Sequence, residues 1–186
     1  MPFYMYDPPE RFVAGAVGQP GERSFYLQAS EGSRITSVSL EKFQVSQLAE
    51  RLDELLDEVL RRTGGSATVP AATPADLADD APLDLPLMEE FRVGAIALAW
   101  DGETDRVVIE AQEESESPVE PLSEEVPADG PGVLRVRLTP GAARAFAQRA
   151  LRIVAQGRPP CPLCGLPLDA TGHVCPRQNG YRAGHD

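Results

Sequence analysis

Two similar segments, one in each half of the sequence, constrain the fold of this chain more than any other feature. Residues 11–18 read RFVAGAVG and residues 90–97 read EFRVGAIA, so that phenylalanine, glycine and alanine recur in the same order. A turn follows each segment, and the residues after each turn, 24–30 and 106–112, favour β-structure. Both halves are therefore expected to begin with a β-hairpin.

The second part of each half repeats as well. Residues 37–60 align without a gap on residues 135–158, and each segment begins with alternating apolar residues that are typical of a strand. Each then continues with apolar residues at the spacing of an amphipathic helix. The two apolar stripes consist of Val45, Leu48, Leu52, Leu55, Leu56 and Val59, and of Ala143, Phe146, Ala150, Ile153 and Val154. Pro140 suits the first turn of the second helix, where its missing N–H costs little.

These patterns predict an α+β fold made of two duplicated β-β-β-α units, residues 1–62 and 89–156. Their strands are expected to form one antiparallel sheet or two packed antiparallel sheets covered by the helices, and the sequence leaves this choice open. Residues 63–88 are rich in proline, alanine and aspartate and are expected to be a mobile linker. Residues 113–132 are an acidic insertion, expected to be a solvated loop. Residues 157–186 form a separate C-terminal tail.

Charge is unevenly distributed between the tail and residues 1–156, which we call the body. The net charge of the chain is −12, to which the body contributes −13 and the tail +1. The acidic body should repel nucleic-acid phosphates, so any anion-binding role is expected in the tail. No secretory signal or membrane-spanning stretch is recognisable, and we expect a soluble cytoplasmic protein that does not bind membranes.

The tail contains all three cysteines and both histidines of the chain. Cys161, Cys164, His173 and Cys175 follow the pattern C-x2-C-x8-H-x-C, in which three thiolates and one imidazole complete a tetrahedral Zn2+ site. Such a closed site is structural, and the metal would stabilise a segment with too few apolar residues for a core. His185 is an alternative fourth ligand. The alternatives to a metal site are incidental surface thiols and a redox-active Cys161/Cys164 pair.

A polar cluster follows the last expected ligand. It consists of Arg177, Asn179, Tyr181 and Arg182, which are suited to bind an anion, a base or an acidic protein surface. The structural alternative is a turn at Asn179, with both arginines paired to the acidic body. These four residues are the candidate partner-binding residues of the chain.

The body lacks the motifs of common catalytic sites. GxGxxG, GxxxxGK[ST], GxSxG and HExxH are all absent, and the body has no histidine. Neighbouring carboxylates such as Asp79 and Asp80, or Glu89 and Glu90, are expected to be surface charges, because adjacent side chains do not point at one place. The sequence therefore assigns no catalytic residue.

Three functions are compatible with these features. The first is a noncatalytic binding or adaptor protein that presents its zinc-binding tail to a protein partner. The second is an enzyme with a small-molecule site, for example for a phosphorylated metabolite, in the groove between the two repeats. The third is weak nucleic-acid binding through the tail alone. The sequence favours the first function and leaves the oligomeric state undetermined.

Three stretches carry a resemblance to a known family. They are FYMYDPPERFVAGAVGQPGERSFYLQA at residues 3–29, FRVGAIALAWD at residues 91–101 and CPLCGLPLDATGHVCPRQNGYR at residues 161–182. In these stretches the chain resembles an actinobacterial family that is catalogued as a domain of unknown function, DUF3090, and sometimes labelled a repeat protein. The resemblance implies no activity, because the family has no established function to carry over.

Overall fold

Three strands and a helix follow one another in each half of the body. A computed structural model describes residues 2–65, 68–156, 161–165 and 175 of the chain. The first half contains β2 (Arg11–Val17), β3 (Ser24–Glu31), β4 (Arg34–Leu40) and α1 (Lys42–Thr63). After a short 3-10 helix, η1 (Ala75–Leu77), the second half contains β5 (Glu89–Asp101), β6 (Arg106–Glu113), β7 (Val133–Leu138) and α2 (Pro140–Ala155). This order agrees with the predicted element sequence, while the origin of both halves from one duplicated unit stays a prediction.

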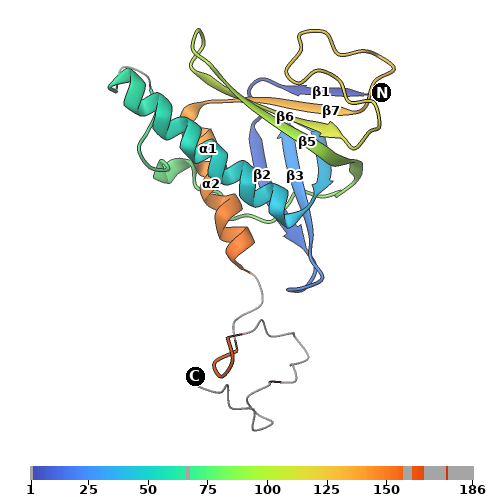
Figure 1. Ribbon diagram of the computed structural model, residues 1–186, viewed down its shortest axis with the longest axis vertical. Helices are drawn as coiled ribbons and strands as arrows, with labels where there is room; N and C mark the ends of the chain where they lie inside the picture. The colour runs from blue at the N-terminus through green and yellow to red at the C-terminus, as the bar shows by residue number, and fades with distance from the viewer. Residues whose placement is uncertain (1, 66–67, 157–160, 166–174, 176–186) are drawn as a thin grey trace, which may run out of the picture.

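All strands of the body belong to one mixed sheet of seven strands, in the order β1-β7-β6-β5-β4-β3-β2 (Figure 1). Within each half, neighbouring strands are antiparallel, as expected. The prediction of a wholly antiparallel arrangement is wrong, because β4 and β5 join the two halves in parallel and β1 is parallel to β7. β4 and β5 are parallel because α1 and the linker between them return the chain to the end of the sheet at which β4 begins.

The N-terminal strand, β1 (Phe3–Tyr6), was not indicated by the sequence pattern. It lies at the edge of the sheet beside β7, with Phe3 opposite Val133. Because this partner is distant in the sequence, no turn signal of a hairpin marks the strand. Tyr6 is fully buried, and its hydroxyl shares a hydrogen bond of 2.8 Å with Thr36 Oγ1 of β4.

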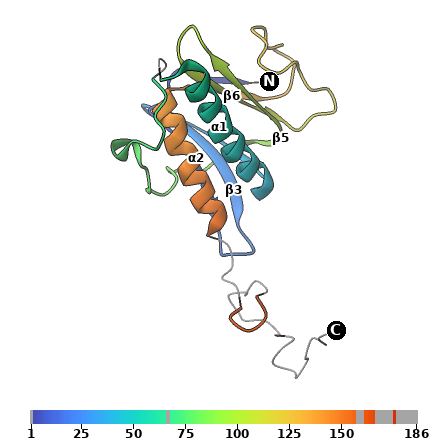
Figure 2. The same ribbon diagram turned by 60° about the vertical axis from the view of Figure 1, so that its left-hand side comes forward.

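Both helices lie side by side on one face of the sheet (Figures 1 and 2). Most residues of the two predicted apolar stripes are buried against the sheet. Phe146 of α2 stacks on Phe12 of β2, with the ring centroids 4.7 Å apart. Thr139 caps α2 by accepting a hydrogen bond from the Ala142 amide, and Pro140 lies in the first turn as predicted. Within the described residues, no helix has the length and apolar character needed to cross a membrane.

The linker wraps around the β2 edge of the sheet, as its described residues 68–88 show. On the helix face, the guanidinium of Arg144 in α2 donates a hydrogen bond to Pro70 O at 3.0 Å. At the edge, Asp79 forms an ion pair of 2.7 Å with Arg11, the first residue of β2. The linker is therefore tied to the start of this edge strand, while Arg149 of α2 donates a hydrogen bond to Ala14 O within the strand at 2.8 Å.

Beyond this edge, the linker lies on the face of the sheet opposite the helices. The Asp84 amide donates a hydrogen bond to Gln28 Oε1 of β3 at 2.8 Å. Gly15 of β2 leaves room for Leu83, because a Cβ atom on Gly15 would lie 2.5 Å from the Leu83 side chain. These contacts correct the expectation of a mobile linker, which rested on composition and did not take these tertiary contacts into account.

The acidic insertion, residues 113–132, lies against the same face over β6 and β7. Glu110 of β6 is 1% exposed and accepts a hydrogen bond from the Leu122 amide at 3.1 Å. Arg135 of β7 donates to Glu110 at 2.7 Å and to Ser123 O at 2.7 Å. A buried ion pair of the sheet thus fixes the middle of the insertion, which corrects the expectation of a purely solvated loop.

Candidate metal centre

The described part of the tail contains a tight turn that carries two of the cysteines. The Gly165 amide donates a hydrogen bond to Cys161 O at 2.8 Å, and this bond closes the turn. Gly165 has a φ of +75°, a left-handed conformation that favours glycine. The local sequence CPLCG therefore brings Cys161 and Cys164 close together without help from the body.

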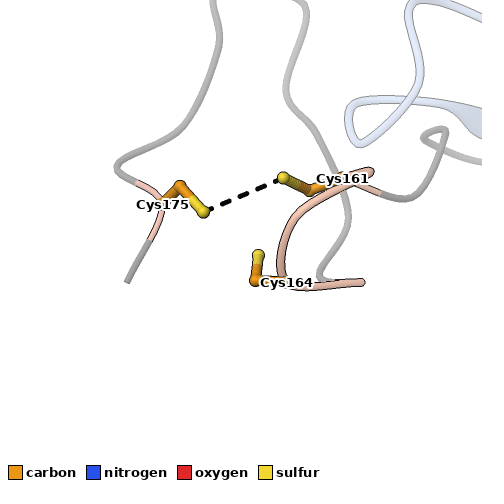
Figure 3. A group of neighbouring side chains, drawn as sticks. All are labelled: Cys161, Cys164 and Cys175. Carbon is orange, nitrogen blue, oxygen red and sulfur yellow. Dashed lines mark hydrogen bonds between the residues drawn. The ribbon is translucent and has the colours of Figure 1, made fainter. Parts of the chain in front are cut away.

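The third cysteine, Cys175, joins this pair from a later part of the tail (Figure 3). The sulfur atoms of Cys161, Cys164 and Cys175 all lie within 4.8 Å of one another. The Cys161 thiol donates a hydrogen bond to Cys175 Sγ at 3.9 Å. Cys161 and Cys175 are buried, and Cys164 is half-buried. The three side chains therefore converge on one point that is largely shielded from solvent.

This arrangement suits metal binding better than a disulfide. A disulfide requires a sulfur–sulfur distance of about 2 Å, whereas Cys161 Sγ and Cys175 Sγ are 3.9 Å apart. Three thiolates that surround a common point are soft donors of the kind that bind zinc and similar transition metals. The three cysteines lie close enough together to ligate one metal ion.

The other predicted site residues of the tail lie outside the described residues. They are the candidate metal ligands His173 and His185 and the candidate partner-binding residues Arg177, Asn179, Tyr181 and Arg182. The fourth ligand and the partner-binding cluster therefore stay predictions. What the structure brings together is the cysteine part of the predicted ligand set.

Two carboxylates that were expected to be ordinary surface charges have defined partners. The hydrogen bond from Arg11 holds the pKa of Asp79 below its usual value, against the opposing effect of burial. Glu89 accepts a hydrogen bond from Ser39 Oγ at 2.7 Å and lines a cavity between β4 and β5. Neither partner could be predicted from the sequence, because both arise from contacts between distant segments.

One of three comparisons with known proteins gives a match. A search of curated proteins and a search of solved structures each found no match. A family described as "Protein of unknown function (DUF3090)" matches residues 4–175, which include both helices and all three cysteines. The match extends over nearly the whole body and into the cysteine-containing part of the tail. The chain therefore belongs to the DUF3090 family, as the resemblance in its sequence indicated.

Proposed function

We propose that this protein is a noncatalytic binding protein whose tail is folded by one structural Zn2+ ion and contacts a protein partner. Cys161, Cys164, His173 and Cys175 are the proposed ligands. The observation that supports this proposal is the spacing of the sulfur atoms. In a tetrahedral zinc site with Zn–S bonds of about 2.3 Å, neighbouring sulfur ligands lie about 3.8 Å apart. Cys161 Sγ and Cys175 Sγ are separated by 3.9 Å.

The proposed ion would have a structural role. Four protein ligands leave no coordination position for water or substrate, so the ion would supply folding free energy rather than catalysis. In small zinc modules this contribution is on the order of 10 kcal/mol. The proximity of Cys175 also argues against the redox alternative, because a redox pair needs only Cys161 and Cys164, and no third buried sulfur.

Metal content tests the first half of this proposal. Elemental mass spectrometry on the untagged full chain should find one zinc per chain in the wild type and in His185→Ala, and none in Cys161→Ser and His173→Ala. Zinc lost from His185→Ala and retained in His173→Ala would reassign the fourth ligand. A wild-type chain without metal, whose thiols titrate readily, would overturn the proposal and favour redox chemistry at Cys161 and Cys164.

The second half of the proposal concerns the partner. The tail has a net charge of +1, while the body has a net charge of −13, so the tail is the part suited to an acidic surface. Arginine and tyrosine are among the residues enriched at the hot spots of protein interfaces, and Arg177, Tyr181 and Arg182 follow directly after the proposed zinc ligands. We therefore expect the partner to offer an acidic surface to these side chains.

A matched pair of variants tests the role of the tail in partner binding. Arg177→Ala/Arg182→Ala removes two charges from the tail, and Arg61→Ala/Arg62→Ala removes two charges from the exposed end of α1. A protein that binds the wild-type chain in a pull-down should also bind the α1 variant. The same protein should fail to bind the tail variant and Cys161→Ser. Equal recovery by both double variants would show that the tail is not the contact surface.

A further inference from the structure

A second candidate site lies where the two halves of the sheet meet. An open cavity of about 570 Å³ is lined there by residues of β3, of β4 and of the start of α1, together with Glu89 and Arg92 of β5. This volume lies within the range of sites that bind small molecules. All described residues that line the cavity belong to the body, and none of them is a proposed metal ligand.

The strand register places three of its polar side chains in one row. Tyr26 of β3 pairs with Ser39 of β4, and Ser39 pairs with Arg92 of β5. Side chains of directly paired residues project from the same face of a sheet, so these three groups lie next to one another. The pairing of β4 with β5 shifts register between Ser37 and Ser39, and such irregularities often redirect side chains beside functional sites.

Cations are concentrated at this cavity despite the acidic character of the chain. Arg23, Lys42 and Arg92 line it, against the two carboxylates of Glu41 and Glu89. This local excess of positive charge contrasts with the net charge of −12 of the whole chain. A cavity lined by more cations than carboxylates in an acidic protein is a place where an anion can bind.

The negative charge of Glu41 is already matched by its neighbours. Glu41 forms an ion pair with Arg92, and its side chain accepts a hydrogen bond from the backbone N–H of Gln44 in the capping box of α1. Lys42 forms no ion pair with any other described residue. Arg23 is directed toward the helices, because its Nη1–H donates to Ile153 O at 3.1 Å and its guanidinium lies over the ring of the core residue Phe25, 5.0 Å from the ring centroid. Lys42 is therefore the cation of this cavity that is left for a ligand.

We propose that this cavity binds a small phosphate ester that carries hydroxyl groups. Ammonium groups are among the side chains that recognise phosphate oxygens, which assigns the phosphate to Lys42. The Glu89 carboxylate, which accepts from Ser39 Oγ at 2.7 Å, has further acceptor capacity for ligand hydroxyls. The ring of Tyr26 offers a flat surface for the carbon skeleton of the ligand.

Inorganic phosphate is the first probe of this site. Titrated into the full chain at constant ionic strength, it should shift backbone amide signals in a nuclear magnetic resonance spectrum at residues 23–26, 39–42 and 89–92. Shifts at these segments support the proposal. No shifts, or shifts only in other parts of the chain, would overturn it. Citrate that produced stronger shifts at the same residues than phosphate would instead assign the cavity to carboxylates.

A matched pair of variants tests the residue assignment. Lys42→Gln and Arg51→Gln each remove one exposed cation from α1, but only Lys42 lines the cavity. Lys42→Gln should weaken phosphate binding by about threefold to tenfold, and Arg51→Gln should leave it unchanged. Equal weakening in both variants would indicate a general charge effect and would overturn the assignment.

The organic part of the ligand is tested with glucose 6-phosphate and glucose. Glucose 6-phosphate should bind at the same residues and more tightly than inorganic phosphate, and glucose alone should bind much more weakly than the ester. Glu89→Gln should reduce the preference for the ester over inorganic phosphate. An ester that binds no more tightly than inorganic phosphate would limit the site to a simple anion and would refute the proposed ester.

Discussion

At the scale of single residues, Arg149 of α2 connects three parts of the body. It is 5% exposed, and its guanidinium donates hydrogen bonds to Ala14 O at 2.8 Å, Ala81 O at 2.6 Å and Asp79 Oδ1 at 3.1 Å. A helix, an edge strand and the linker thus share one buried cation. Removal of a buried partner is costly because it leaves the remaining polar groups unsatisfied.

We predict that Arg149→Met lowers the free energy of unfolding by about 3 kcal/mol, because the carbonyl groups and the Asp79 carboxylate lose their buried donor. Urea denaturation of the purified variant measures this effect. Arg152→Met is the control on the same helix, since Arg152 is 42% exposed and pairs with the exposed Asp80. Arg152→Met should lower the free energy of unfolding by about 1 kcal/mol or less. Equal losses in both variants would mean that the buried network does not stabilise the fold.

The carboxylate of Asp79 makes stability depend on pH. Its folded-state pKa lies below the ordinary value of 3.8, chiefly because Arg11 donates a hydrogen bond to it. A group with a lowered folded-state pKa stabilises the fold above its unfolded-state pKa, and this contribution is lost as the pH falls through the folded-state value. The free energy of unfolding should therefore fall less steeply below pH 4 in Asp79→Asn than in the wild type, as urea denaturation at several pH values would show. An Asp79→Asn variant whose stability fell as steeply below pH 4 as that of the wild type would contradict this account.

The sequence contains a partial signal for this network. Arg149 lies three residues after Phe146 and directly before Ala150, on the apolar side of a predicted helix. An arginine in that position indicates a buried partner. The identity of the partner does not follow, because Asp79 is 70 residues away and reaches Arg149 only through the path of the linker.

At the scale of elements, the acidic insertion is held to the sheet by Glu110. We predict that Glu110→Ala releases the insertion, because Arg135 then loses its buried carboxylate and the Leu122 amide loses its acceptor. The free energy of unfolding should fall by about 3 to 5 kcal/mol. Hydrogen exchange should accelerate at residues 118–126.

Glu120→Ala is the matched control for this prediction, since it removes one exposed acidic charge from the insertion itself. It should leave hydrogen exchange of the insertion nearly unchanged. If both variants accelerated exchange equally, the insertion would respond to its net charge rather than to the buried ion pair.

The strands show which elements the sequence could predict. Residues 11–17 and 24–31 combine an alternating or apolar pattern with a local turn, and the hairpin of β2 and β3 follows from these signals. The short strand β1 and the parallel pairing of β4 with β5 were missed. Both depend on partners that are distant in the sequence, and periodicity carries no information about such partners.

At the scale of the whole molecule, the hydrophobic core lies in the strands and helices of the body. We predict that a zinc chelator shifts the melting temperature of the body by on the order of 1 °C or less, because none of the three described ligands, Cys161, Cys164 and Cys175, belongs to that core. The fluorescence of Trp100, the single tryptophan, reports the melting of the body because this residue packs against the core. Hydrogen exchange at residues 161–165 should accelerate under the same conditions. A large drop in the Trp100 melting temperature would show that the tail stabilises the body.

The two candidate sites differ in how far the sequence could predict them. The C-x2-C spacing is local, so the convergence of Cys161 and Cys164 follows from a short turn, and the sulfur of Cys175 lies within 4.8 Å of both. The cavity between the halves combines side chains from β3, β4, α1 and β5. No single stretch of sequence contains its cations together, and only the register of the sheet brings them to one place.

The position of β1 beside β7 affects how the chain is made. Phe3 pairs with Val133, so the ribosome must add 130 residues after Phe3 before its partner exists. At about 5 to 20 residues per second, this delay is roughly 7 to 26 seconds. Contacts of such long range also slow folding after synthesis. During this interval the nascent chain carries an unpaired N-terminal strand, and this is the period in which a chaperone or a bulky N-terminal fusion has most influence on the yield of native protein.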